Sequence, residues 1–119
     1  MKVNKRGYFR YGVSSVERYE NFFKSLMHGG NIVVAKDTEF LALNYEDGDT
    51  LPVWSSEDEA KAALPEEDWP IFEYIVFTPS EFFEKFVPPY DGMYVTIRPN
   101  QRGEAKTISL QEFREALSL

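Results

Sequence analysis

The chain has 119 residues, which suffice for one hydrophobic core but not for two separate ones. It contains no cysteine, which excludes disulfides, thiolate nucleophiles and zinc–thiolate sites, and its one histidine, His28, excludes metal sites built from several histidines. Acidic residues outnumber basic ones by 20 to 13, and no run approaches the roughly 20 apolar residues that a membrane helix needs. We therefore expect a cytoplasmic protein without a secretory signal or a membrane segment, which carries no metal or cofactor.

The first expected elements are an extended arm and a helix. Residues 1–14 are polar and basic, which predicts an arm ahead of a single domain over residues 15–119. Ser14 and Glu17 match a capping box, in which the serine caps a helix and the glutamate reaches back to it. Apolar side chains then recur at spacings of three and four, which predicts a helix that ends at Gly29–Gly30.

Three short apolar strands and a second helix are predicted next. The strands cover residues 32–35, 40–43 and 51–54. The first two strands are almost wholly apolar, so we expect both of their faces to be covered. Pro52 cannot donate to a strand ladder, which predicts an edge or end position for the third. The run from Ser56 to Glu59 repeats the capping-box pattern and predicts a helix as far as Leu64.

The second half of the chain continues the alternation of strands and helices. After a charged loop over residues 66–70, residues 71–77 give the strongest strand signal. Thr78 to Glu81 predicts a helix start, strands follow over 93–97 and 107–108, and Ser109 caps a terminal helix. Together these patterns predict an α+β fold, with a small mixed, mainly antiparallel sheet and about four short helices packed on it.

Negative charge is concentrated in the middle of the chain. Residues 37–68 hold eleven acidic groups and one basic group, Lys61, whereas residues 1–24 hold six basic and two acidic groups. One hypothesis is a face that attracts a basic protein partner. The other is a solvated surface, because carboxylates are also favoured in turns and in the first turn of a helix.

The binding hypothesis names nine candidate residues, including the two tryptophans that flank the predicted acidic helix. Exposed tryptophans would anchor a partner, whereas buried ones would belong to the core. The candidates are Asp47, Asp49, Trp54, Glu57, Asp58, Glu66, Glu67, Asp68 and Trp69. An immunity protein that neutralises a toxin is one concrete form of such a binding module.

Two alternative hypotheses rest on other residues. Glu73 shares a face of its predicted strand with apolar side chains, and a carboxylate in apolar surroundings has the raised pKa of a catalytic acid. It could then serve a hydrolase or an isomerase, but an edge strand with Glu73 in water is the simpler interpretation. Residues 5–11 interleave basic and aromatic side chains, as nucleic-acid-binding segments do, although the acidic composition disfavours this function.

The familiar catalytic motifs are missing from the sequence. It contains no phosphate-binding loop, no dinucleotide fingerprint and no nucleophilic serine elbow. The run Asp47-Gly48-Asp49 lacks the ligand spacing of a calcium loop, and His28 follows the first predicted helix, where a capping or surface role is expected. The sequence therefore names no catalytic residues and favours a non-enzymatic binding module over an enzyme.

Three motifs follow one another in a distinctive order. They are Glu17-Arg18-Tyr19 with Phe22-Phe23, then Leu51-Pro52-Val53-Trp54 before an acidic helix with Ala60, then Phe82-Phe83 and Phe86-Val87-Pro88 before Gly92, Val95 and Pro99. In this arrangement, residues 15–117 resemble the bacterial family called domain of unknown function 2750. The second half of that stretch is also similar to the serine-sensitivity enhancer B domain.

The chain departs from the family pattern at two places. A tryptophan is expected in the strand after the first helix, where the sequence has Asn31-Ile32-Val33-Val34, and a proline is expected where Ser55 follows Trp54. The resemblance implies a small bacterial cytoplasmic protein without an assigned activity. It supplies no catalytic residues.

Overall fold

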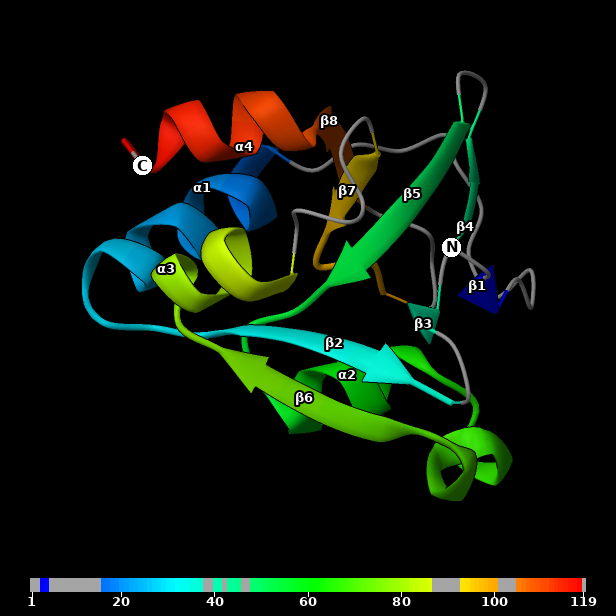
Figure 1. Cartoon of the computed structure of the whole chain (residues 1–119). Coiled ribbons are helices and arrows are strands. Elements are labelled where there is room, and N and C mark those ends of the chain that lie inside the picture. Colours follow the sequence, from blue (N-terminus) through cyan, green and yellow to red (C-terminus); the bar gives the residue numbers. More distant parts are fainter. Residues whose placement is uncertain are drawn as a thin grey trace.

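Figure 1 shows a computed structural model of the chain, which describes residues 3–4, 16–37, 40–41, 43–45, 48–86, 93–100 and 105–118. The helical elements are α1 (Val16–Met27), α2 (Glu57–Ala63), the 3₁₀-helix η1 (Glu66–Ile71), α3 (Pro79–Glu81), the π-helix η2 (Phe82–Phe86) and α4 (Leu110–Ala116). The strands are β1 (Val3–Asn4), β2 (Ile32–Lys36), β3 (Phe40–Leu41), β4 (Leu43–Tyr45), β5 (Gly48–Val53), β6 (Glu73–Phe77), β7 (Tyr94–Ile97) and β8 (Lys106–Ser109).

Within the described ranges, the strands form two four-stranded sheets, with the orders β1-β3-β2-β6 and β4-β5-β7-β8. The pairs β1–β3 and β5–β7 are parallel and the remaining pairs are antiparallel. This confirms the predicted α+β class with mixed, mainly antiparallel pairing. The strands are divided over two sheets rather than one, and a bridge between Val33 and Trp54 joins them.

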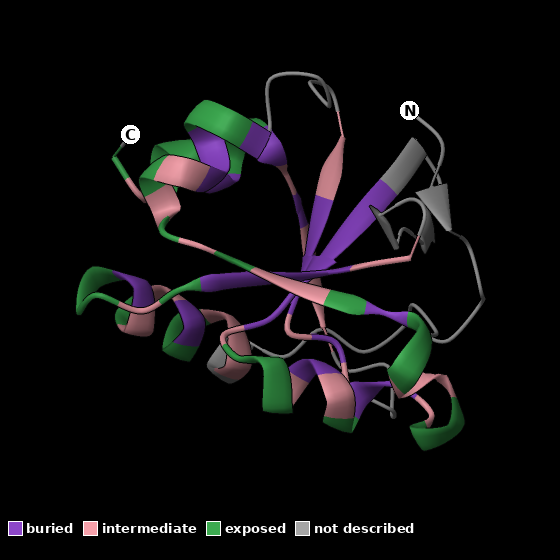
Figure 2. Cartoon of the chain, turned by 60° about the horizontal axis from the view of Figure 1, so that its bottom comes forward, coloured by how far each residue is buried: buried purple, intermediate pink, exposed green. Residues whose placement is uncertain are grey.

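Strand β2 lies between two hydrophobic cores. Ile32 and Val34 enter the larger core, whereas Val33 and Ala35 enter the smaller one, because successive side chains of a strand point to opposite faces. All four side chains are at most 1% exposed, which confirms the prediction that both faces of this strand are covered. Figure 2 shows the buried strand passing between helices that turn their exposed faces outward.

The two cores occupy opposite sides of β2 and collect different helices. Helices α1 and α4 and the α3–η2 turn lie on the side of the larger core, and α2 lies on the other (Figure 1). The larger core contains Phe22, Leu26, Leu51, Val53, Phe82, Phe83, Phe86, Val95, Ile97, Ile108, Leu110 and Phe113, besides Ile32 and Val34. The smaller core consists of Val33, Ala35, Trp54, Ala60, Ala63, Leu64 and Phe72. This smaller core supports the surface considered below.

The predicted helix starts are partly confirmed in atomic detail. Thr78 and Glu81 form a complete capping box, with each side chain accepting from the backbone N–H of the other. Ser56 and Ser109 also cap their helices by accepting from backbone N–H groups three residues later. Ser14 lies outside the described residues, as do most residues of the predicted arm over 1–14.

Two helical stretches differ from the expected elements. Residues 66–71 form η1 instead of a loop, so β6 begins at Glu73 and not at residue 71. The third helix widens into the π-helical turn η2, which places Phe82, Phe83 and Phe86 together in the larger core. A π-turn is a local widening of the helix that sequence periodicity does not reveal.

Pro52 lies inside the order of its sheet but not between two ladders. Strand β4 pairs only with residues 48–50 of β5, whereas β7 pairs with residues 50–53. In the described part of the sheet, Pro52 therefore has a ladder neighbour on one side only. The prediction of an edge or end strand was nevertheless wrong for β5, which lies between β4 and β7. The missing N–H of Pro52 is tolerated because the ladder with β4 stops before this residue.

The end of α1 depends on two adjacent glycines. Gly29 has a φ of +87°, which favours glycine, and the N–H of Gly30 donates to the carbonyl of Ser25 at 2.8 Å. A Cβ atom on Gly30 would lie 2.6 Å from that carbonyl oxygen, far inside normal contact. The turn must open before any larger residue fits at position 30.

We predict that Gly30→Ala lowers the free energy of unfolding by about 2–3 kcal/mol, because the added methyl group must push the backbone of α1 aside. Gly29→Ala meets no atom within 4 Å and should cost only about 1–2 kcal/mol for its left-handed backbone. Urea denaturation of both variants measures the difference. A smaller loss for Gly30→Ala than for Gly29→Ala would contradict the described turn.

Candidate binding site

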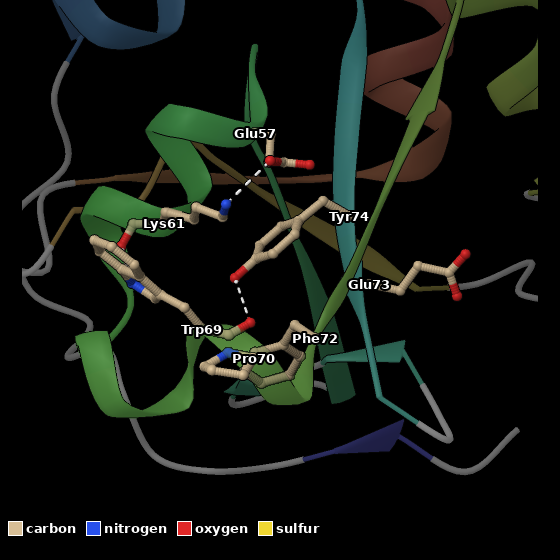
Figure 3. A pocket seen from close by; sticks show the side chains of 7 residues that line it. All are labelled: Glu57, Lys61, Trp69, Pro70, Phe72, Glu73 and Tyr74. Carbon is tan, nitrogen blue, oxygen red and sulfur yellow. Dashed lines mark hydrogen bonds and ion pairs between the residues drawn. The ribbon is translucent and has the colours of Figure 1, made fainter.

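A pocket of about 460 Å³ opens on the side of the molecule that carries α2. Glu57 and Lys61 of α2 line it, together with Trp69 and Pro70 of η1. Phe72, Glu73 and Tyr74 complete the lining at the start of β6. We call these seven residues the α2–η1 pocket, and Figure 3 shows them from close by.

Aromatic side chains form the walls of the α2–η1 pocket, and their positions are fixed by the smaller core. Phe72 is 7% exposed and belongs to that core, and Trp69 and Tyr74 pack against it while remaining partly exposed. The indole Nε1–H of Trp69 donates to the carbonyls of Lys61 and Leu64 at 2.7 and 3.0 Å. These bonds reinforce the C-terminal end of α2, where the carbonyl of Lys61 also accepts from the backbone N–H of Leu64 at 3.1 Å.

A charged pair lies along the α2 side of the pocket, beside the ring of Tyr74. The Nζ atom of Lys61 lies 3.1 Å from a carboxylate oxygen of Glu57 and 5.5 Å from the centroid of the Tyr74 ring. The Tyr74 hydroxyl donates to the carbonyl of Trp69 at 3.4 Å, as Figure 3 shows. Partial burial, and then the negative charge of Glu57, raise the pKa of Tyr74, so its hydroxyl is neutral at physiological pH.

Acidic side chains are concentrated on α2 and η1, the two helices that line this pocket. Glu57 and Asp58 stand in the first turn of α2, and Glu66 and Glu67 stand in the first turn of η1. All four are exposed, and Asp68 is partly exposed. We call these five residues the acidic face. The basic residue of α2 and η1 is Lys61, so the acidic face carries strong negative charge.

Most of the residues that the sequence proposed for binding are brought together on the acidic face. Glu57, Asp58, Glu66, Glu67, Asp68 and Trp69 all lie on α2 or η1. Trp54 must be removed from the set, because it is 0% exposed in the smaller core and its Nε1–H donates to the carbonyl of Pro99. Asp47 and the side chain of Asp49 lie outside the described part of the chain.

The carboxylate of Glu73 does not have the setting that acid–base catalysis needs. Glu73 begins the edge strand β6, is exposed, and points away from Lys61 and Tyr74 in Figure 3. The structure thus gives the water-exposed edge position, without apolar cover for the carboxylate. The described residues also contain no group of three His, Asp or Glu side chains that could hold a metal ion.

Glu59 pairs with a residue far away in the chain, which no local sequence pattern indicates. Its carboxylate accepts from the N–H and the hydroxyl of Ser55 at 3.0 and 3.1 Å, and from the guanidinium of Arg98, whose Nε lies 2.8 Å away. The carbonyl of Arg98 in turn accepts two hydrogen bonds from the Arg18 guanidinium at 3.0 and 2.6 Å. This chain of contacts ties α2 to α1 and to the end of β7.

The comparisons with known proteins agree with the resemblance noted in the sequence. The family model described as "Protein of unknown function (DUF2750)" matches residues 19–117. The chain belongs to the DUF2750 family. The comparisons with curated proteins and with solved structures give no match.

The matched range of this DUF2750 protein includes every residue of the pocket and of the acidic face. None of its helices in the described ranges is long and apolar enough to cross a membrane. The family description assigns no activity, so the function must be argued from the site itself.

We predict that Glu59→Gln destabilises this DUF2750 protein by about 2–3 kcal/mol at neutral pH, because a charge-assisted bond to a mostly buried guanidinium is lost. Burial alone would raise the pKa of Glu59, but hydrogen bonds from Arg98 and Ser55 outweigh it and lower the pKa below the ordinary 4.5. The stabilisation is therefore complete above the pKa of the unfolded chain and disappears as the pH falls through the lower pKa of the folded chain.

Denaturant titrations of both proteins from neutral pH into the acid range measure this effect, and the two curves should converge only once the pH has fallen below the lowered pKa of folded Glu59. Glu57→Gln is the matched control in the same helix, because its pairing with Lys61 is exposed and should contribute less than about 1 kcal/mol. Equal losses for the two variants would show that the Arg98 contact adds nothing.

Proposed function

We propose that this DUF2750 protein is a non-enzymatic binding module of the bacterial cytoplasm, and that it holds a basic protein partner on the acidic face. The observation that supports the proposal is the α2–η1 pocket, which is lined by the two helices that carry the acidic face and has aromatic walls. Helix dipoles explain why carboxylates begin α2 and η1, but a purely solvating surface has no need of a pocket walled by Trp69, Phe72 and Tyr74. Aromatic anchors within a charged rim are typical of protein interfaces.

The expected physics of such a complex is electrostatic. Several exposed carboxylates on one face attract a basic surface over distances of about one Debye length, roughly 10 Å at 0.1 M salt. This attraction raises the association rate and weakens as salt is added. The aromatic walls would contribute the part of the affinity that salt does not remove.

The two alternative functions have less support. A hydrolase or isomerase using Glu73 would need an enclosed carboxylate directed at a second polar group. Glu73 does line the α2–η1 pocket, but it is exposed at an edge strand and points away from Lys61 and Tyr74. Nucleic-acid binding would depend on residues 5–11, which lie outside the described residues. The acidic face provides no phosphate-binding surface for it.

We predict that replacing Asp58, Glu66 and Glu67 by their amides abolishes capture of basic proteins from a bacterial extract. The wild-type chain should retain such proteins at about 50 mM salt and release them at about 500 mM, because added ions screen exposed charges. Mass spectrometry of the retained fractions, read together with the isoelectric points of the proteins, provides the measurement.

The matched control is a triple variant with Glu20, Glu84 and Glu115 changed to glutamine. These residues are also exposed, and they stand on α1, η2 and α4, across β2 from the acidic face. Both triple variants change the net charge by the same amount, so only the position of the charge differs. Retention of no basic protein by the wild type, or equal retention by both variants, would reject the proposed function.

A further inference from the structure

The α2–η1 pocket already holds a cation, which is the chain's own Lys61. Its ammonium lies between the carboxylate of Glu57 and the face of the Tyr74 ring, at 3.1 Å from the first and 5.5 Å from the ring centroid. An ammonium within about 6 Å of an aromatic face is attracted by the electrons of the ring. The pocket therefore combines the two groups that recognise an alkylammonium ion, a carboxylate and an aromatic face.

The hold on Lys61 is weak and easily exchanged. Its side chain is 32% exposed and that of Glu57 is 51% exposed, and exposed pairs of this spacing contribute little to stability. Lys61 can swing into solvent without disturbing α2, because the backbone of α2 is held by other contacts, including the Trp69 indole. The aromatic walls stay in place when it leaves, since Phe72 and Tyr74 are fixed by the smaller core.

We propose that the α2–η1 pocket is the anchor site for a lysine side chain of the basic partner, which displaces the ammonium of Lys61 from the Tyr74 ring and pairs with Glu57. This inference rests on the proposed function and specifies which part of the partner is recognised. Charge complementarity supports it, because Glu57 lines the pocket and the same two helices carry the other carboxylates of the acidic face. The volume of about 460 Å³ is ample for one lysine side chain.

The test uses a hexalysine peptide as the probe and the full chain as the receptor, with affinities measured by calorimetry at low salt. Lys61→Met keeps the apolar stem and removes the competing ammonium, so binding should tighten about two- to five-fold. Lys85→Met is the matched control, because Lys85 also pairs with a glutamate four residues earlier, Glu81, and its removal changes the net charge equally. That control should change the affinity by less than about 1.5-fold.

A second pair of variants tests the ring itself at constant net charge. Tyr74→Leu removes the aromatic face and should weaken binding about two- to five-fold, whereas Tyr74→Phe keeps the face and should bind like the wild type. The indole N–H signal of Trp69 in a proton–nitrogen NMR spectrum, assigned with Trp69→Phe, should shift on binding, and that of the buried Trp54 should not. The same spectra show whether each variant is folded.

The outcomes separate this inference from the proposed function. Suppose that the triple variant of Asp58, Glu66 and Glu67 no longer binds hexalysine, but that the affinities are equal within each matched pair, Lys61→Met with Lys85→Met and Tyr74→Leu with Tyr74→Phe. The acidic face then binds the peptide, but the pocket is not an anchor site. If hexalysine does not bind the wild type at low salt, both proposals fail. The anchor site is supported if Lys61→Met binds hexalysine more tightly than the wild type, and if Tyr74→Leu binds it more weakly while Tyr74→Phe does not.

Discussion

The burial of both faces of β2 is the constraint on which the rest of the structure depends. A strand with one solvent-exposed face loses buried contacts on one side only when it moves. In β2, every side chain from Ile32 to Ala35 is part of a core, so a shift would disrupt packing on both sides. Through the Val33–Trp54 bridge the same strand also joins the two sheets. The position of α2 against the smaller core, and with it the pocket surface, therefore follows from the way β2 is enclosed.

Local rules were sufficient for much of the fold. Capping residues, the glycine pair after α1 and the apolar run of β2 each act within a few residues, so the sequence predicted these elements and the α+β class. The division into two sheets depends on parallel pairing of β5 with β7, whose residues are more than forty positions apart. Propensity contains no information about such pairings, and the π-turn at Phe82–Phe86 likewise arises from packing of phenylalanines in the larger core.

The candidate site was predictable in its charge but not in its geometry. The acidic residues of α2 and η1 could be identified from the sequence, because they are close together in the chain and stand on two consecutive short helices. The contact of Lys61 with Tyr74 needs the packing of α2 beside β6, and the pairing of Glu59 with Arg98 spans 39 positions. The sequence left Trp54 either as an exposed anchor or as a core residue, and the bridge to Val33 and its complete burial decide for the core.

The indole of Trp69 forms a wall of the pocket and also donates hydrogen bonds to the carbonyls of Lys61 and Leu64 at the end of α2. A side chain held in this way has already given up its rotational freedom when the chain folds. A molecule that binds against this indole does not need to order the Trp69 side chain, so binding costs little side-chain conformational entropy at this residue. A preorganised surface of this kind can recognise its target while burying only a small area.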